Sequence, residues 1–119
     1  MRQCPVDSLT KAPWGSWEVL LDANYCKVKR IIVHPEQRLS YQKHQQREEH
    51  WTIVKGIGIF TLDGTVQDVT EGDTLFIAKQ ACHRIENPGN TPLIFIEIQR
   101  GSYFGEDDII RLEDDYHRS

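Results

Sequence analysis

Turn-forming residues interrupt this chain at short intervals, and that spacing is its strongest structural constraint. Asp63-Gly64 is a typical two-residue hairpin turn, and residues 87–90, Asn-Pro-Gly-Asn, form a second clear turn signal. The segments between such signals are rich in β-branched and aromatic residues, which favour strands over helices. We predict strands at residues 17–21, 25–33, 39–45, 49–55, 59–62, 65–69, 74–78, 81–86 and 93–99. About nine or ten short strands with turns every ~8–12 residues predict an all-β sandwich or barrel.

The two ends of the chain show different patterns. Residues 105–112 have apolar residues at helix-like spacing and acidic residues at the start, so we predict a short C-terminal helix packed outside the barrel. Residues 1–12 are predicted to form an N-terminal arm. Residues 13–119 are predicted to form one domain, because no repeat or Gly-, Pro- or Ser-rich linker divides them. A chain of 119 residues can bury a core without disulfides.

Charge and cysteine content exclude several protein classes. The formal net charge of −4 argues against nucleic acid as the main partner. No apolar run approaches the ~20 residues that a membrane-spanning helix needs, and the N-terminus has no hydrophobic signal region. Cys4, Cys26 and Cys82 are an odd number without CxxC spacing, which fits a reducing compartment. We therefore expect a cytoplasmic protein with no nucleic-acid or membrane partner.

Four potential metal ligands are spaced so that one site could collect them. Side chains alternate along a strand, so Gln42 and His44 point to the same face, and a tight turn after His44 could bring in Glu49. His83 offers a fourth ligand. Imidazole nitrogen with carboxylate and amide oxygen suits one divalent ion: Zn²⁺ first, then Mn²⁺, Co²⁺, Ni²⁺ or Fe²⁺. Four ligands leave positions open on a five- or six-coordinate metal, which favours catalysis or ligand binding. The alternative is that both histidines are hydrogen-bonded residues on a half-exposed sheet.

The spacing of these residues resembles the two motifs of the cupin family. The first motif, G-x5-H-x-H-x3,4-E-x6-G, is matched by Gln42-x-His44-x4-Glu49-x6-Gly56, with Gln in place of its first His. The second motif, G-x5-P-x-G-x2-H-x3-N, is matched by Gly72-x5-Ala78-x-Gln80-x2-His83-x3-Asn87. The resemblance implies a cupin fold, an RmlC-like jelly roll in which two sheets form a double-stranded β-barrel around a metal.

A narrower resemblance covers nearly the whole chain. Besides the Gln-x-His pattern, the segments involved are Pro13-Trp14-Gly15, Lys29-Arg30-Ile31, Leu39-Ser40-Tyr41-Gln42, residues 47–51, residues 83–87, residues 97–101 and residues 103–111. In these segments the chain resembles type II phosphomannose isomerases, including the isomerase half of bifunctional mannose-1-phosphate guanylyltransferases. This resemblance implies a metal-dependent interconversion of mannose 6-phosphate and fructose 6-phosphate through an enediol, in nucleotide-sugar and polysaccharide precursor metabolism.

Such an isomerase needs a base and a phosphate-binding cation. Glu97 is our candidate base, because it is a carboxylate in an otherwise apolar strand and burial there would raise its pKa. The alternative is that Glu97 makes a structural hydrogen bond or ion pair. Arg47, in the turn between the two metal-bearing strands, is our first phosphate candidate and counts as part of the catalytic set. The further substrate-binding candidates are Lys29, Arg30, Arg84 and Gln99.

Two other functions remain open at this stage. The chain could be a non-catalytic sugar-binding cupin that keeps a metal cavity without the base, or a metal-dependent oxygenase of the same fold. The expected ligand is a phosphorylated hexose. By analogy with small cupins that pair through an exposed sheet, and because apolar residues surround Trp14 and Trp17, we expect a homodimer.

Overall fold

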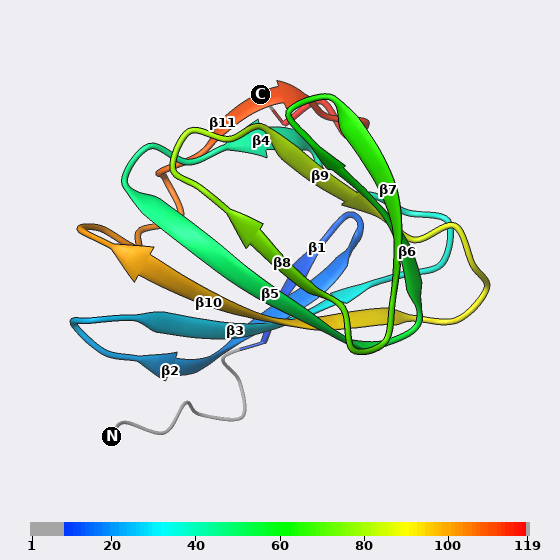
Figure 1. Ribbon diagram of the computed structural model, residues 1–119, viewed down its shortest axis with the longest axis horizontal. Coiled ribbons are helices and arrows are strands. Elements are labelled where there is room, and N and C mark those ends of the chain that lie inside the picture. Colours follow the sequence, from blue (N-terminus) through cyan, green and yellow to red (C-terminus); the bar gives the residue numbers. More distant parts are fainter. Residues whose placement is uncertain (1–8, 119) are drawn as a thin grey trace.

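The computed structural model describes residues 9–118, which form eleven strands in two facing sheets (Figure 1). The first sheet has six strands in the order β1-β2-β3-β10-β5-β8, and the second has five in the order β11-β4-β9-β6-β7. The strands are β1 Leu9–Ala12, β2 Gly15–Asp22, β3 Lys27–Val33, β4 Tyr41–Lys43, β5 Arg47–Lys55, β6 Ile57–Leu62, β7 Thr65–Thr70, β8 Thr74–Ile77, β9 His83–Glu86, β10 Leu93–Gly101 and β11 Ile110–Glu113.

This arrangement confirms the predicted all-β jelly roll. Neighbouring strands in both sheets pair antiparallel, and several neighbours, such as β3 with β10 and β4 with β9, lie far apart in sequence. The two sheets pack face to face and are not closed by hydrogen bonds into one continuous barrel. Among the described residues no helix is long and apolar enough to cross a membrane.

The prediction of a C-terminal helix at residues 105–112 is wrong. A turn, in which the Asp108 amide donates to the Gly105 carbonyl oxygen at 3.1 Å, leads into β11, which pairs antiparallel with β4. Exposure alternates along this segment, with Ile110 exposed and Arg111 half-buried. The apolar spacing did not distinguish the two structures, because a short run with three closely spaced aliphatic residues fits a helix as well as a strand.

The predicted N-terminal arm is described only in its last part. Residues 1–8, and with them Cys4, lie outside the described residues. Leu9–Ala12 forms β1, an edge strand that pairs with β2. The chain then turns tightly at Gly15, where an added Cβ would lie 1.9 Å from the Ile32 carbonyl oxygen, so no larger side chain fits without moving the backbone. The proposed boundary at residue 12 stays a prediction.

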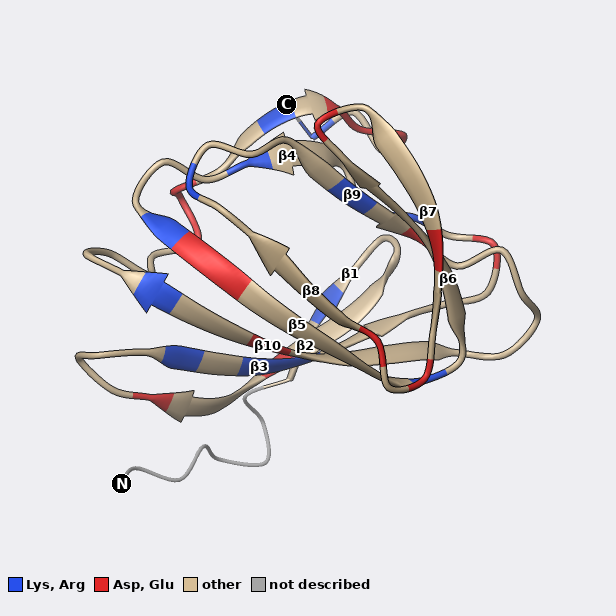
Figure 2. Cartoon of the chain, in the orientation of Figure 1, with Lys and Arg blue, Asp and Glu red and all other residues tan. Residues whose placement is uncertain are grey.

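The interior of the sandwich changes from apolar to polar along its length. The inward residues of β5 run from Ile53 through Trp51 to Glu49. Those of the neighbouring strand β10 run from Phe95 to Glu97 and then Gln99. The antiparallel register places the apolar Phe95 opposite Ile53, Glu97 opposite Trp51 where the character changes, and the polar Gln99 opposite Glu49. Trp51 stacks on Phe95 with ring centroids 4.3 Å apart and closes the apolar half. Figure 2 shows charged residues on the neighbouring strands β3, β10 and β5. Polar side chains are therefore buried together at one end of the sandwich.

Candidate metal centre

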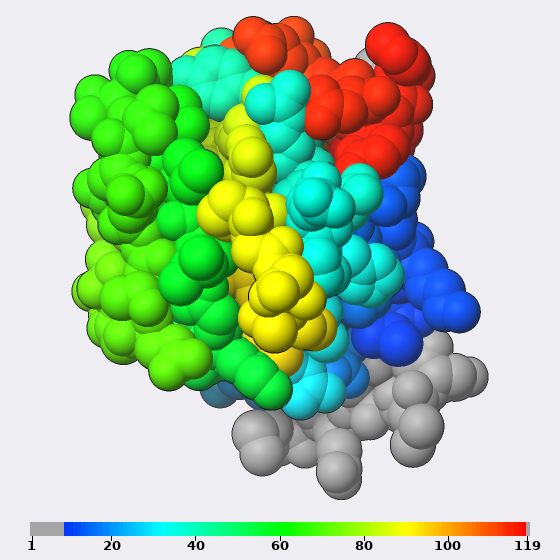
Figure 3. Space-filling model, turned by 90° about the vertical axis from the view of Figure 1, so that its right-hand side faces the viewer, coloured from blue at the N-terminus to red at the C-terminus, as the bar shows by residue number. Residues whose placement is uncertain are grey.

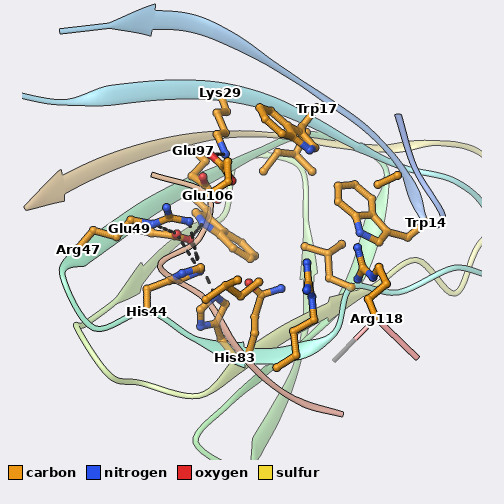
Figure 4. A pocket seen from close by; sticks show the side chains of 17 residues that line it. Trp14, Trp17, Lys29, His44, Arg47, Glu49, His83, Glu97, Glu106 and Arg118 are labelled. Carbon is orange, nitrogen blue, oxygen red and sulfur yellow. Dashed lines mark hydrogen bonds and ion pairs between the residues drawn. The ribbon is translucent and has the colours of Figure 1, made fainter. Parts of the chain in front are cut away.

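Three predicted ligands converge in the polar half of the interior. His44 directly follows β4, Glu49 is on β5 and His83 begins β9. All three are almost completely buried, and one ligand atom from each lies within 4.8 Å of the others. The His44 Nε2 atom is 3.3 Å from Glu49 Oε2, and the His83 Nε2 atom is 3.9 Å from Glu49 Oε1 (Figure 4). The turn after His44 and the contact between the two sheets thus bring residues from three strands to one point.

The hydrogen bonds behind the two imidazoles suit metal binding. The His44 Nδ1–H group donates to the Asp108 carbonyl oxygen at 2.5 Å, and the His83 Nδ1–H group donates to the Ala81 carbonyl oxygen at 3.0 Å. Because a backbone carbonyl oxygen can only accept, the Nδ1 atom of each ring carries the proton in these hydrogen bonds. In this tautomer the Nε2 lone pair of each ring faces Glu49 and can bind a metal.

Gln42 lies next to this group in the same sheet. It pairs directly with His83 between β4 and β9, it is buried, and it lines the same cavity. Its amide nitrogen donates to Ser40 Oγ at 3.0 Å, which leaves the amide oxygen as its donor atom for a metal. Two imidazole nitrogens, one carboxylate and one amide oxygen fit a divalent ion of borderline-to-hard character.

Burial and neighbouring groups set the charges of these ligands. Burial lowers the pKa of His44, so the ring is neutral near pH 7. Burial alone would raise the pKa of Glu49, but interactions with His44, His83 and Arg47 outweigh it and bring that pKa to about 2. Glu49 accepts hydrogen bonds from Arg47 Nε and from Trp51 Nε1, both at 2.9 Å. The carboxylate is therefore ionised and held in place, as a metal ligand must be.

Glu97 lies beside the ligands on the six-stranded sheet and lines the same cavity. Burial, followed by the nearby Glu49 carboxylate, raises the pKa of Glu97 to about 8. A protonated Glu97 then donates a hydrogen bond to Glu49. Gln99 does not line the cavity; its amide donates to Glu97 Oε2 at 2.6 Å from behind. A buried carboxyl group of this kind can hold or release a proton close to neutral pH.

Two of the proposed cations also face the cavity, which has a volume of about 110 Å³. Arg47 is buried, its Nη2 atom lies 3.3 Å from His44 Nε2, and its Nη1 atom has no hydrogen-bond partner among the described residues. Lys29 packs over the Trp17 ring, 4.0 Å from its centroid, and forms an ion pair with Glu106 at 2.5 Å. Arg47 thus points to the ligands, while the charge of Lys29 is largely balanced by Glu106.

The other two predicted cations lie outside this cavity. Arg30 is exposed and pairs with Glu18 on the outer face of the six-stranded sheet. Arg84 donates through Nε to the Leu39 carbonyl oxygen at 2.9 Å and does not line the cavity. Each follows a cavity residue, Lys29 or His83, and strand alternation turns it to the opposite face. Neither is kept in the substrate site proposed below.

The C-terminal segment supplies cavity residues that the sequence analysis did not assign. They are Glu106, Ile109, Arg111 and Arg118. Asp108, in the same segment, accepts hydrogen bonds from the backbone amides of Gln45 and Gln46 at 3.0 and 2.9 Å. Glu106, Ile109 and Arg111 fall within residues 103–111, which carry the family resemblance, whereas Arg118 lies outside that segment.

Comparison with known protein families gives one match over most of the chain. Residues 4–114 match the family described as "Mannose-6-phosphate isomerase C-terminal". A mannose-1-phosphate guanylyltransferase of Klebsiella pneumoniae is 46% identical over 106 residues, or 89% of this chain and 22% of that protein. The alginate biosynthesis protein AlgA of Pseudomonas aeruginosa is 46% identical over 107 residues, 90% of this chain and 22% of its own length. The chain therefore corresponds to about a fifth of these relatives.

Solved structures support the fold. A double-stranded β-helix protein of Klebsiella pneumoniae superposes with a TM-score of 0.72 at 20% identity, covering 95% of this chain and 86% of that one. A Lactobacillus farciminis oxalate decarboxylase gives a TM-score of 0.76 at 21% identity over 87% of this chain and 33% of its own. Identities this low show the fold alone. Taken with the match over residues 4–114, they establish that this chain is a cupin-fold member of the mannose-6-phosphate isomerase C-terminal family.

Proposed function

We propose that this chain is a metal-dependent isomerase that interconverts mannose 6-phosphate and fructose 6-phosphate. The observation that carries the proposal is the convergence of His44, Glu49 and His83 in one buried cavity beside the Glu97 carboxyl group, in a member of this family. Gln42 completes a four-residue ligand set. The sugar-binding and oxygenase alternatives share the ligand set but give no role to a proton-exchanging carboxyl group next to it.

The reaction moves one proton between C1 and C2 of the open-chain sugar and one proton between the oxygens on these two carbons. A divalent ion held by the four ligands would stabilise the negative charge that develops on the C1 and C2 oxygens. Glu97, in its ionised form, would take the proton from one carbon and return it to the other, because its carboxyl group faces the same space. Arg47 would donate through its Nη1 group to a substrate oxygen at the reacting end. Gln99 would hold the Glu97 carboxyl group in position.

An isomerisation assay with mannose 6-phosphate tests this function. The purified chain supplied with Zn²⁺ should convert mannose 6-phosphate to fructose 6-phosphate, and His44→Ala should abolish the conversion. His50→Ala is the matched control, because His50 is on the outer face of β5, where it contacts Glu48 and Phe76. Stoichiometric metal binding without turnover would instead support a sugar-binding module, and oxygen consumption with Fe²⁺ would support an oxygenase.

Three finer points belong to the same proposal. Zn²⁺ is the proposed metal, on the donor set alone. A homodimer is proposed because apolar side chains are exposed on the outer face of the six-stranded sheet, among them Val54, Phe76 and Ile98; a monomeric mass in sedimentation would contradict it. A cytoplasmic location is proposed because Cys26 and Cys82 are free thiols. The phosphorylated hexose is the proposed partner ligand.

A further inference from the structure

The proposed isomerase must bind the phosphate group far from its reacting carbons. In an extended open-chain hexose 6-phosphate, bonds of about 1.5 Å place the phosphorus roughly 8–9 Å from C1. Arg47 Nη2 lies 3.3 Å from His44 Nε2, so Arg47 belongs to the end where C1 and C2 would react. A substrate with its C1 and C2 oxygens at the ligands cannot also place its phosphate there unless it folds back on itself. The phosphate site must be sought elsewhere in the cavity.

Charges lining the cavity are unevenly distributed. Its acidic residues are Glu49, Glu97 and Glu106, and Figure 4 shows all three near Arg47 and Lys29. Arg118 lies at the other side of the same view, beside Trp14. Arg111 is the other arginine that lines the cavity from the C-terminal segment. Two guanidinium groups therefore mark a positive region distinct from the mixed charges at the metal end.

The β-sheet register sets the distance between this region and the ligands. Arg111 on β11 pairs with Gln42 on β4, and Gln42 pairs with His83 on β9. These three residues form one row across the five-stranded sheet. Strands in a sheet are about 4.8 Å apart, so the Arg111 backbone lies one step, roughly 5 Å, from that of the ligand Gln42 and two steps, roughly 10 Å, from that of His83. Arg111 therefore lies next to the ligand group, on the side away from His83.

Arg111 and Arg118 line the same cavity. Burial, followed by the positive charge of Arg118, lowers the pKa of Arg111. Asp114 holds Arg118 in place, accepting from its Nε at 2.9 Å and its Nη2 at 3.2 Å, and Asp114 does not line the cavity. Asp114 balances part of the Arg118 charge, but two guanidinium groups lining one cavity still offer several N–H donors, the geometry that binds a phosphate group. Figure 3 shows the C-terminal residues, in red, close to the N-terminal strands, in blue, which agrees with Arg118 and Ala12 lining one cavity.

We propose that Arg111 and Arg118 form the phosphate subsite, so that the substrate lies extended along the row from His83 through Gln42 to Arg111. Arg47 then acts on the reacting oxygens and is not the phosphate ligand. This inference rests on the proposed function for the identity of the sugar. The subsite itself can be tested without turnover.

The test is calorimetric binding of mannitol 1-phosphate, an acyclic hexitol phosphate that cannot isomerise, to the whole chain with Zn²⁺ added. Arg111→Met and Arg118→Met should each weaken binding at least tenfold. Arg111→Lys and Arg118→Lys should recover part of the affinity, since a cation remains. Arg30→Met is the matched control on the outer face and should bind as the parent chain does. Circular dichroism and melting temperature show that each variant is folded.

The outcomes separate this subsite from the isomerase proposal. If mannitol 1-phosphate binds and depends on Arg111 and Arg118 while mannose 6-phosphate is not converted, the subsite stands and the isomerase proposal fails. The subsite is overturned if the parent chain does not bind mannitol 1-phosphate. It is equally overturned if Arg47→Met weakens binding more than both tail variants, or if the folded tail variants bind as Arg30→Met does.

Discussion

Asp108 should control both the stability of the domain and the affinity of the metal site. Its carboxylate accepts two hydrogen bonds, from the amides of Gln45 and Gln46, in the turn that joins the two ligand-bearing strands β4 and β5. Its carbonyl oxygen accepts the His44 Nδ1–H group. Asp108 is buried, with 8% of its surface exposed, so loss of its carboxylate removes two hydrogen bonds from the turn, which keeps its backbone bonds from Gln80 and Ser102.

The expected effect of Asp108→Ala follows from these contacts. Hydrogen bonds to a charged group contribute about 1.5–3 kcal/mol each, but Gln45 and Gln46 are exposed and water can replace much of the loss. We expect the free energy of unfolding to fall by about 2 kcal/mol, which corresponds to roughly 8 °C in Tm for a domain of this size. The backbone carbonyl that accepts the His44 Nδ1–H group is kept in Asp108→Ala, so the metal site is affected only through the loosened turn, and Zn²⁺ binding should weaken about tenfold.

Thermal unfolding of the metal-free chain and Zn²⁺ titration against a chelating indicator measure the two effects separately. Asp107→Ala is the matched control, because Asp107 is the exposed neighbour and carries the same charge. Asp108→Asn, which keeps one acceptor oxygen, should fall between the parent and Asp108→Ala. The reasoning is refuted if Asp108→Ala and Asp107→Ala give the same Tm and the same Zn²⁺ affinity.

Three further predictions concern the backbone, acid stability and metal removal. Gly56→Ala should lower the free energy of unfolding, measured by urea denaturation, by about 2 kcal/mol. Gly56 has a φ of 92°, and an added Cβ would lie 2.7 Å from the Pro92 carbonyl oxygen. Gly64→Ala is the control and should lower the free energy of unfolding by about half as much, because the space around its Cβ is open. The pKa of Asp114 is lowered from its ordinary 3.8 to about 2, mainly by hydrogen bonds from Arg118. This carboxylate therefore contributes stability above about pH 4, and that stability is lost as the pH falls toward 2. Asp114→Asn should therefore reduce the loss of Tm between pH 4 and pH 2, and an unchanged slope would contradict it. Chelation with EDTA should lower the Tm of the Zn²⁺-loaded chain, since a metal present at 100 times its Kd stabilises by about 2.7 kcal/mol, whereas His83→Ala should show little response to EDTA.

Much of the fold follows from local patterns. The hairpin signal at Asp63-Gly64 does join two paired strands, β6 and β7, because a two-residue turn specifies its own register. The spacing of Gln42 and His44 likewise predicted a shared face, since alternation along an extended chain is a property of the backbone. Those inferences need only residues that are near one another in sequence.

The placement of the tail needed the tertiary structure. Residues 105–112 fit a helix by apolar spacing, and only pairing with β4 decides that Ile110 faces solvent and Arg111 faces the cavity. Alternation also could not say which of the adjacent cations Lys29 and Arg30 points inward, because that depends on which face of the sheet is covered by the second sheet.

The sequence by itself therefore determined the all-β class, the jelly-roll family and the set of potential ligands. The tertiary structure decided that Glu97 lies beside Glu49, that Asp108 supports His44, and that Arg111 and Arg118 line the same cavity. The reason is physical: strand formation and side-chain alternation are local, whereas a cavity is built from residues whose distance depends on how distant strands pair and how two sheets pack.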